Sequence, residues 1–223
     1  WWGSPVGIVT DPAFFQKSPA DQRHSLDQYS WVEFVHPAAT LPDRRALAEA
    51  GFFYTDTQIR FRLDLTRIKP SPCAEALTME SADQTAFSIR DGELRPFPHE
   101  RFLALPGASE PKVSQRYVLW SNNLIRQYPA TAFRFLQDGN VQGWFLSFPG
   151  KGVLELTLAM LAADSNTSGF DLYSRAVSEY AQRGFRLGTA SFSIHNSPVH
   201  NIYSALGARF LEPRECWMWI RPD

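Results

Sequence analysis

The sequence has few cysteines, no long apolar run and no excess of charge of either sign. Its 223 residues include only 2 cysteines, so a dense disulfide framework is excluded and reduced thiols in a cytoplasmic protein are expected. Lysine and arginine number 22 against 23 aspartate and glutamate residues, a formal net charge of -1. This balance argues against a nucleic-acid binder and a polybasic membrane anchor. No stretch approaches the ~18 apolar residues of a membrane span, so neither nucleic acid nor membrane is expected as a partner.

Metal-binding and targeting patterns are missing as well. His36, His99 and His200 have no metal-like spacing and no Cys/His cluster exists, so no metal is expected. The first residues lack a basic region followed by an apolar core, so no signal peptide is expected. Aromatic residues are abundant, with 17 Phe, 7 Tyr and 7 Trp. They indicate a well-filled core and, in an enzyme, pockets for flat or sugar-like ligands.

The first third of the chain predicts a small α/β domain over residues 1–70. Its elements are expected to be a strand, a helix that stops at a glycine, and an amphipathic strand, at residues 31–36, 41–51 and 55–65. The following stretch is rich in Pro, Ser and Ala and has little periodicity, which predicts a linker over residues 71–85. A larger second domain is then expected over residues 86–223.

The second domain predicts a helix and then alternating strands and helices of a mixed α/β sheet. Apolar spacings of three and four favour a helix over 111–128, with Pro129 ending it. Two strands joined at Asp138-Gly139-Asn140 form a hairpin signal. From about residue 131 the expected order is β-β-β-α-β-α-β, with strands at 153–161 and 187–195 and helices at 170–183 and 197–207.

One internal similarity links the two parts of the chain. The stretch ALAEAGFFYTDTQIRFRL, residues 46–63, is similar to IYSALGARFLEPRECWMWI, residues 202–220. Both read as a helix, a glycine followed by an aromatic residue or strand, and then an amphipathic strand. The similarity indicates that the N-terminal domain is a partial copy of the C-terminal half-fold. Chance similarity of helix–turn–strand units is the alternative.

The stretch from residue 164 to 210 carries a family resemblance. It reads DSNTSGFDLYSRAVSEYAQRGFRLGTASFSIHNSPVHNIYSALGARF, with Asn196, Tyr203 and Gly207 in register after a helix that runs from Gly169 to Gly184. In this order of turn, helix, strand and helix it resembles the GCN5-related N-acetyltransferases, over roughly residues 131–220. The resemblance implies the fold of that superfamily, acetyl-CoA as cosubstrate and a small-molecule amine as acceptor.

Two upstream stretches resemble the TDP-amino-sugar N-acetyltransferases more closely. They are LAEAGFFYTDTQIRFRLDL and the segment that contains Arg101, Phe102, Tyr117 and Trp120. The resemblance implies an amino sugar, most simply a nucleotide-linked one, as acceptor. Arginines would pair with a diphosphate and aromatic rings would stack on a base or a sugar face. The candidate acceptor residues are Arg101, Tyr117, Trp120, Arg126 and Trp144, and core packing is the alternative for Tyr117 and Trp120.

The resemblance also implies where the cosubstrate lies. In the resembling enzymes it occupies a V-shaped splay between two parallel strands, which here would be 153–161 and 187–195. Backbone N–H groups of Ala159, Met160 and Leu161 would bond the pantetheine arm and the developing oxyanion. The pyrophosphate would lie on the turn before the next helix, formed by Asn166, Thr167, Ser168, Gly169 and Phe170.

This turn departs from the family pattern. Thr167 stands where the family has a glycine, and Asp164 where it has Gln or Arg. Asp164 and Asp171 would repel a phosphate, which puts tight coenzyme A binding in doubt. A polar loop that caps the following helix is the alternative interpretation.

Three residues are the catalytic candidates. Tyr203, whose ordinary pKa of about 10 exceeds the about 8.5 of a thiol, is the expected acid for the departing thiolate. A core tyrosine is the alternative role. Glu155 and His195 are the candidate bases, with solvated or capping roles as alternatives. Asn196 is expected to contact the cosubstrate or to cap the helix that starts at Ser197.

Together these observations predict an N-acetyltransferase that works by direct attack in a ternary complex. Acetylation of another amine, such as a polyamine, an antibiotic or a peptide N-terminus, is one alternative, and transfer from a longer acyl-CoA is another. A non-catalytic module of the same fold is the third. A homodimer is left open.

Overall fold

A computed structural model describes residues 2–222, and its nine strands form one mixed sheet in the order β1-β2-β9-β3-β8-β7-β6-β5-β4. The strands are β1 Val6–Val9, β2 Trp31–Pro37, β3 Phe53–Asp64, β4 Thr78–Ser81, β5 Ala132–Gln137, β6 Asn140–Pro149, β7 Leu154–Leu161, β8 Leu187–Ser193 and β9 Arg209–Ile220. The α-helices are α1 Pro19–Leu26, α2 Arg44–Glu49, α3 Pro72–Glu75, α4 Glu110–Gln127, α5 Gly169–Gln182 and α6 Ser197–Ala205. Short 3-10 helices are η1 Pro12–Gln16, η2 Ala38–Thr40, η3 Leu65–Arg67, η4 Arg101–Ala104 and η5 Pro129–Thr131.

The order of elements expected from about residue 131 is confirmed. Strands β5, β6 and β7 are followed by α5, β8, α6 and β9. The β5–β6 hairpin turns at Asp138 (φ 51°) and Gly139 (φ 79°), the positive-φ pair of a tight two-residue turn that matches the twist of the strands. The long helix before the hairpin is α4, and its serine cap at Ser109 accepts from Lys112 N.

The interpretation of residues 71–85 as a linker is wrong. This segment contains α3 and then β4, which pairs antiparallel with β5 at the edge of the sheet, with Thr78 opposite Leu136. Leu77 is 2% exposed and belongs to the core beneath the sheet. A four-residue edge strand is too short to show a period in sequence, and its partner strand lies more than 50 residues away.

Strand β3 joins the N-terminal segment to the rest of the sheet. It lies between β8 and β9 and pairs antiparallel with both. One sheet therefore continues through both of the domains expected from sequence, while the boundary between them stays a prediction. Phe61 and Leu63 of β3 are fully buried in the core that α5 and α6 cover. The N-terminal segment thus completes the main core.

The two similar stretches are the same kind of unit in the structure. Helix α2 ends before Gly51 (φ 83°) and leads into β3, and α6 ends before Gly207 (φ 79°) and leads into β9. Both glycines take the left-handed conformation that commonly ends a helix. The two strands then pair with each other.

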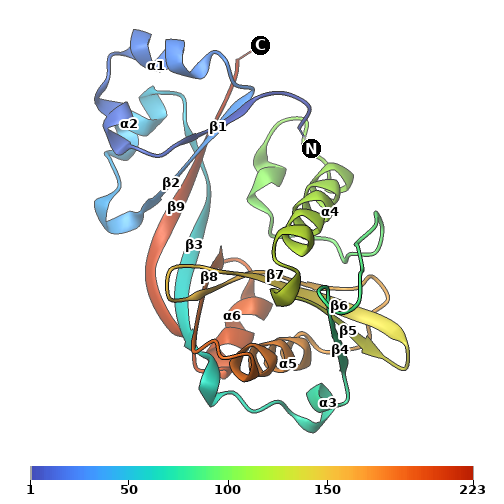
Figure 1. The fold of residues 1–223 in the computed structure, drawn as a ribbon. Coiled ribbons are helices and arrows are strands. Elements are labelled where there is room, and N and C mark those ends of the chain that lie inside the picture. The colour runs from blue at the N-terminus through green and yellow to red at the C-terminus, as the bar shows by residue number, and fades with distance from the viewer. Residues whose placement is uncertain (1, 223) are drawn as a thin grey trace.

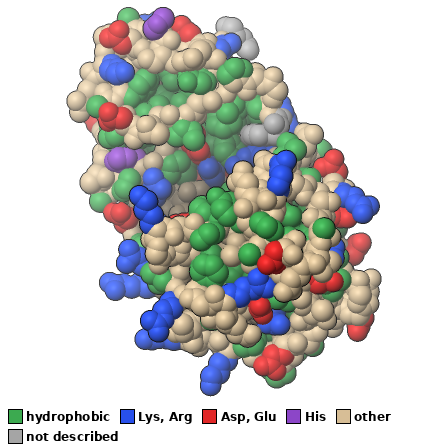
Figure 2. Space-filling model, in the orientation of Figure 1, with side chains coloured by type: hydrophobic (Ala, Val, Ile, Leu, Met, Phe, Trp, Pro, Cys, Tyr) green, Lys and Arg blue, Asp and Glu red, His purple; other side chains and the backbone are tan. Residues whose placement is uncertain are grey.

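The helices cover the sheet on both faces. Around β5–β8, α4 lies on one face and α5 and α6 lie on the other, while α1 and α2 cover the far end formed by β1, β2 and β9 (Figure 1). The molecular surface is hollowed between the part that carries α1 and α2 and the part that carries α5 and α6 (Figure 2). Within residues 2–222, no helix has both the length and the apolarity that crossing a bilayer requires.

Candidate active site

The two parallel strands β7 and β8 separate after a short contact. They pair only at Leu154 with Gly188 and at Glu155 with Thr189. Gly188 permits this close approach, because a Cβ there would lie 2.8 Å from Leu156 Cδ1. Beyond this point the strands diverge and a cavity of about 680 Å³ opens between them. The splay expected from sequence is therefore present.

A β-bulge in β7 sets which side chains face the cavity. Phe148 lies opposite Glu155 and Leu146 opposite Leu158, so β7 has one more residue than β6 between these pairs. The bulge reverses the alternation of the strand. Leu156 faces the core under α5 and α6, whereas Leu158 faces the core under α4.

Backbone groups of β7 are exposed along the splay. Ala162 N donates to Gln142 O of β6, and in an antiparallel ladder alternate residues direct their polar groups to the same neighbour. By this alternation Ala159 and Leu161 direct their N–H groups away from β6, toward the cavity. Met160 directs its own N–H to β6, so the expectation that it donates to the cosubstrate is wrong.

The turn before α5 is bound by a side chain of the protein. Gln142, which is 4% exposed, accepts through Oε1 from Asn166 N at 3.1 Å and from Thr167 N at 3.3 Å. Ser168 caps α5 by accepting from Asp171 N, and its hydroxyl donates to the Asp171 carboxylate. The interpretation of this turn as a helix cap is thus confirmed.

Few of the turn's polar groups face the splay. The amides of Asn166 and Thr167 already have a partner on the β6 side, and among the turn residues 166–170 only Gly169 lines the splay cavity. Phe170 packs against the core instead. Asn166, Thr167, Ser168 and Phe170 therefore do not line the splay cavity, and pyrophosphate binding at this turn stays a prediction.

Tyr203 lines the cavity from α6 and is 3% exposed. Its ring lies 3.9 Å from Phe61 and 5.3 Å from Tyr173, measured between ring centroids. Burial raises the pKa of the Tyr203 hydroxyl well above its ordinary value of 10.0. The structure thus gives Tyr203 both of its expected positions, in the core and at the splay.

Asn196 caps α6, because its side chain accepts from Val199 N at 3.3 Å. It also lines the splay cavity, so contact with a ligand there stays a prediction.

The two candidate bases differ in position. Glu155 lines the cavity where β7 and β8 meet, and one of its carboxylate oxygens lies 3.9 Å from Arg60 Nη2. His195 is exposed beyond the end of β8 and is not among the residues that line the cavity. Of the two, only Glu155 is placed in the cavity.

The acceptor residues expected from sequence are divided by the structure. Arg101, Tyr117 and Trp120 line the splay cavity on the α4 side. Arg126 is exposed and donates to Asn123. It follows Tyr117 by nine residues, which at about 100° per residue is half a turn around α4, so it points away from the cavity. Arg126 is therefore not at this site.

Trp144 also lies elsewhere. It is 2% exposed, packs in the core under α4 and lines a second cavity of 640 Å³ beside residues 86–93. Because side chains alternate along β6, Trp144 points to the face of the sheet that α4 covers. Strand β7 lies between β6 and the splay, so Trp144 is separated from it.

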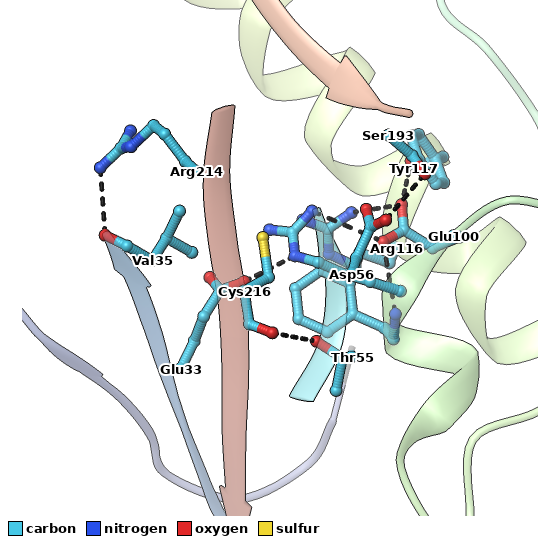
Figure 3. A network of polar contacts seen from close by, with 12 residues as sticks. Glu33, Val35, Thr55, Asp56, Glu100, Arg116, Tyr117, Ser193, Arg214 and Cys216 are labelled. Atoms are coloured by element: carbon cyan, nitrogen blue, oxygen red, sulfur yellow. Dashed lines mark hydrogen bonds and ion pairs between the residues drawn. The ribbon is translucent and has the colours of Figure 1, made fainter. Parts of the chain in front are cut away.

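A buried polar network forms the α4 side of the cavity and was not recognised from sequence. Arg101 Nε donates to Glu33 Oε1 at 2.6 Å, and its Nη1 lies 3.8 Å from Glu100. Glu100 also accepts from the Tyr117 hydroxyl and lies 3.8 Å from Arg116 (Figure 3). The pKa of Arg101 is raised, because the attraction of Glu33 and Glu100 outweighs burial, which by itself would lower it. Burial raises the pKa of the Tyr117 hydroxyl.

Asp56 of β3 is the second feature that sequence reasoning missed. It is 3% exposed, lines the cavity and accepts from the Ser193 hydroxyl at 2.9 Å (Figure 3). Burial raises the pKa of its carboxyl, while Ser193 and the backbone of Thr57 act in the opposite direction. In the sequence Asp56 is an acidic residue within an amphipathic strand. Strands with a solvent-exposed face commonly contain such residues, so this pattern did not single it out. No cluster of His, Cys, Asp and Glu within residues 2–222 has an arrangement that could hold a metal ion.

No protein-family model matches the chain, and no curated protein is significantly similar to it in sequence. Solved structures are similar. A GCN5-related N-acetyltransferase from Sphaerobacter thermophilus has a TM-score of 0.55 at 15% identity, over 86% of this chain and 60% of that one. A tandem protein of the same superfamily from the clavulanic acid pathway has a TM-score of 0.53 at 14% identity, over 92% and 69%.

A third similar structure contains the glucosamine N-acetyltransferase region of a fungal multi-domain β-N-acetylglucosaminidase. Its TM-score is 0.55 at 12% identity, over 86% of this chain and 26% of that one. The chain thus spans less than two thirds of two of these three structures, 60% of one and 26% of the other. At these identities the similarity concerns the fold, and the chain has the fold of the GCN5-related N-acetyltransferases.

Proposed function

We propose that this protein transfers an acetyl group from acetyl-CoA to the primary amine of a small polar molecule, with an amino sugar as the expected acceptor. The observation that carries the proposal is the splay of β7 and β8, whose cavity is lined from both faces of the sheet. Tyr173 and Tyr203 line it on the α5–α6 side, and Tyr117 and Trp120 on the α4 side. Two substrates can therefore meet between the strands.

The residues present fit the thioester of acetyl-CoA better than they fit its pyrophosphate. The N–H groups of Ala159 and Leu161 are free of the β6 ladder and can donate to a carbonyl oxygen in the splay. The turn before α5 fits a pyrophosphate poorly, because Gln142 occupies two of its amides. We therefore expect acetyl-CoA to be held mainly by the strands.

In the proposed reaction, acetyl-CoA supplies an activated thioester as cosubstrate. The acceptor ammonium loses a proton to Glu155, His195 or water. Of the two side chains, Glu155 lines the cavity and His195 does not. As the amine forms the new C–N bond and the C–S bond breaks, the amides of Ala159 and Leu161 stabilise the oxyanion. Tyr203 donates its proton to the thiolate.

The form of the amino sugar follows from the arginines. Arg95, Arg101 and Arg116 line the cavity, but each already has a protein partner, namely the carbonyl of Ser165 or a carboxylate of Glu33 or Glu100. Arg101 and Arg116 are thus neutralised by carboxylates, and only Arg95 keeps a charge that could meet a diphosphate. We therefore propose a free amino sugar, such as the acceptor type named for the fungal glucosamine N-acetyltransferase region, in place of a nucleotide-linked one.

The experiment has two arms. Calorimetry with acetyl-CoA measures cosubstrate binding, and thiol release from acetyl-CoA is then followed with glucosamine, a UDP-amino sugar and spermidine. Replacement of Ala190, which lines the splay, by Trp should abolish binding, whereas Leu119→Trp on the exposed face of α4 should leave it unchanged. Release with glucosamine but not with the nucleotide sugar is the expected result.

The second candidate function is a non-catalytic binding module of the same fold. The occupied amides of Asn166 and Thr167 favour it, because they are lost to phosphate binding. Absence of acetyl-CoA binding at millimolar concentration would support this candidate and refute the first. A cytoplasmic location and a homodimer stay predictions from sequence.

A further inference from the structure

The α4 side of the splay cavity contains a buried carboxylate that lacks an ionic partner. Asp56 is 3% exposed and accepts one side-chain hydrogen bond, from Ser193. No Lys, Arg or His within residues 2–222 forms an ion pair with it. Carboxylates buried to this extent are normally paired, because the cost of removing a charge from water has to be offset.

The neighbouring acids already have their cations. Glu33 and Glu100, each 8% exposed, share Arg101, and Glu100 also lies beside Arg116. Three buried carboxylates therefore face two guanidinium groups. Among these five groups one positive charge is missing when Asp56 is ionised, and the third arginine of the cavity, Arg95, forms no ion pair with Asp56 and donates to the Ser165 carbonyl.

The other groups around Asp56 do not supply that charge. Arg101 and His195 act on it only at longer range, and Arg101 is engaged with Glu33. Cys216, opposite Asp56 on β9, is a neutral thiol, since burial raises its pKa to about 12. Arg214 lies on the other side of β9 and donates to Val35 O (Figure 3).

We propose that Asp56 binds the ammonium group of the acceptor, so that the acceptor is recognised as a cation and positioned by a residue of the N-terminal segment. This inference rests on the proposed function, because it assigns the second substrate of that reaction. Asp56 lines the same cavity as Glu155 and Tyr203. Beside it, Tyr117 and Phe97 stack with ring centroids 3.7 Å apart and offer a wall for the body of the amine.

The probe is a matched pair of ligands, 2-phenylethylamine and 2-phenylethanol, which differ chiefly in the ammonium group. Binding of each is measured by calorimetry at pH 7 to wild type, to Asp56→Asn and to Asp64→Asn. Asp64 lies on the same strand but outside the cavity, so it is the matched control. We expect the amine to bind wild type and Asp64→Asn alike, and Asp56→Asn at least 10-fold more weakly, with no such loss for the alcohol.

A second measurement does not depend on a variant. Titration of the Asp56 carboxyl by ¹³C NMR should give a lower pKa with 2-phenylethylamine present than without it, because a bound cation favours the carboxylate. Equal amine affinity in wild type and Asp56→Asn, no amine binding, or an unchanged Asp56 pKa would overturn the inference.

Calorimetry with acetyl-CoA alone separates the two proposals. If acetyl-CoA fails to bind while the amine still binds through Asp56, the ammonium site stands and the proposed acetyl transfer falls. If acetyl-CoA binds and Asp56→Asn leaves amine affinity unchanged, the ammonium site falls and acetyl transfer stands.

Discussion

Replacement of Tyr203 by Phe separates the two roles that the sequence left open. The ring packs against Phe61, Phe192 and Tyr173, at centroid distances of 3.9, 5.8 and 5.3 Å. The side chain lines the splay, and none of the hydrogen bonds found within residues 2–222 involves its hydroxyl. Tyr203→Phe keeps the ring contacts, so we expect the free energy of unfolding to change by less than about 1 kcal/mol.

The effect on the reaction should be much larger. General acid catalysis contributes about 10²- to 10⁴-fold to a rate, equivalent to about 2.7–5.4 kcal/mol of activation free energy. Because burial raises the pKa of Tyr203 well above 10.0, the hydroxyl keeps its proton across the usual assay range. We therefore expect kcat to fall about 100-fold or more, with acetyl-CoA affinity nearly unchanged.

The assay combines thiol release with thermal unfolding and acetyl-CoA calorimetry on the same preparations. Tyr173→Phe is the control, since Tyr173 lines the same cavity and is similarly buried. Tyr203→Ala should instead cost about 3–5 kcal/mol in stability, because it removes the ring. A kcat for Tyr203→Phe within about 3-fold of wild type would refute the acid role and leave Tyr203 as a packing residue.

Three further predictions concern stability. Gly143→Ala should cost at least about 1–3 kcal/mol, measured as a lowered Tm, because its Cβ would lie 2.4 Å from a backbone oxygen of β7; an unchanged Tm would contradict this. Gln142→Ala should cost about 1–3 kcal/mol and speed hydrogen exchange at Asn166 and Thr167, whose amides lose their acceptor; protected amides would show another partner. Asp56→Asn should be more stable than wild type near pH 7. The raised pKa of Asp56 means that wild type loses stability as pH rises through that pKa, so the advantage should disappear below about pH 3.8, and a constant difference would argue against it.

Much of the fold could be predicted because the signals are local. The Asp138-Gly139 turn, the helical spacing of α4 and the alternation of β3 each report on a few neighbouring residues. The position of β3 between β8 and β9 could not be derived in this way. Pairing between distant strands depends on the whole sheet, and an amphipathic strand carries no record of its neighbours.

The candidate site also contains residues that the sequence placed correctly and residues that it did not. The positions of Tyr203 and Asn196 at the splay were expected from the family resemblance, which is carried by one strand and the helix after it. Arg126 was misplaced because helical phase decides which face of α4 a residue lies on. Trp144 was misplaced because only the sheet order shows that it faces a different cavity.

The sequence alone determined the order of elements from β5 to β9 and the residues that end α2, α4, α5 and α6, because these depend on periodicity and backbone preference. Only the tertiary structure decided which charges meet. Asp56, Glu100 and Arg101 come from β3, from the residue before η4 and from η4 itself, and they form one buried group at the splay. Whether a carboxylate is solvated or buried without a cation depends on what surrounds it in space, and that is fixed only when the sheet is assembled.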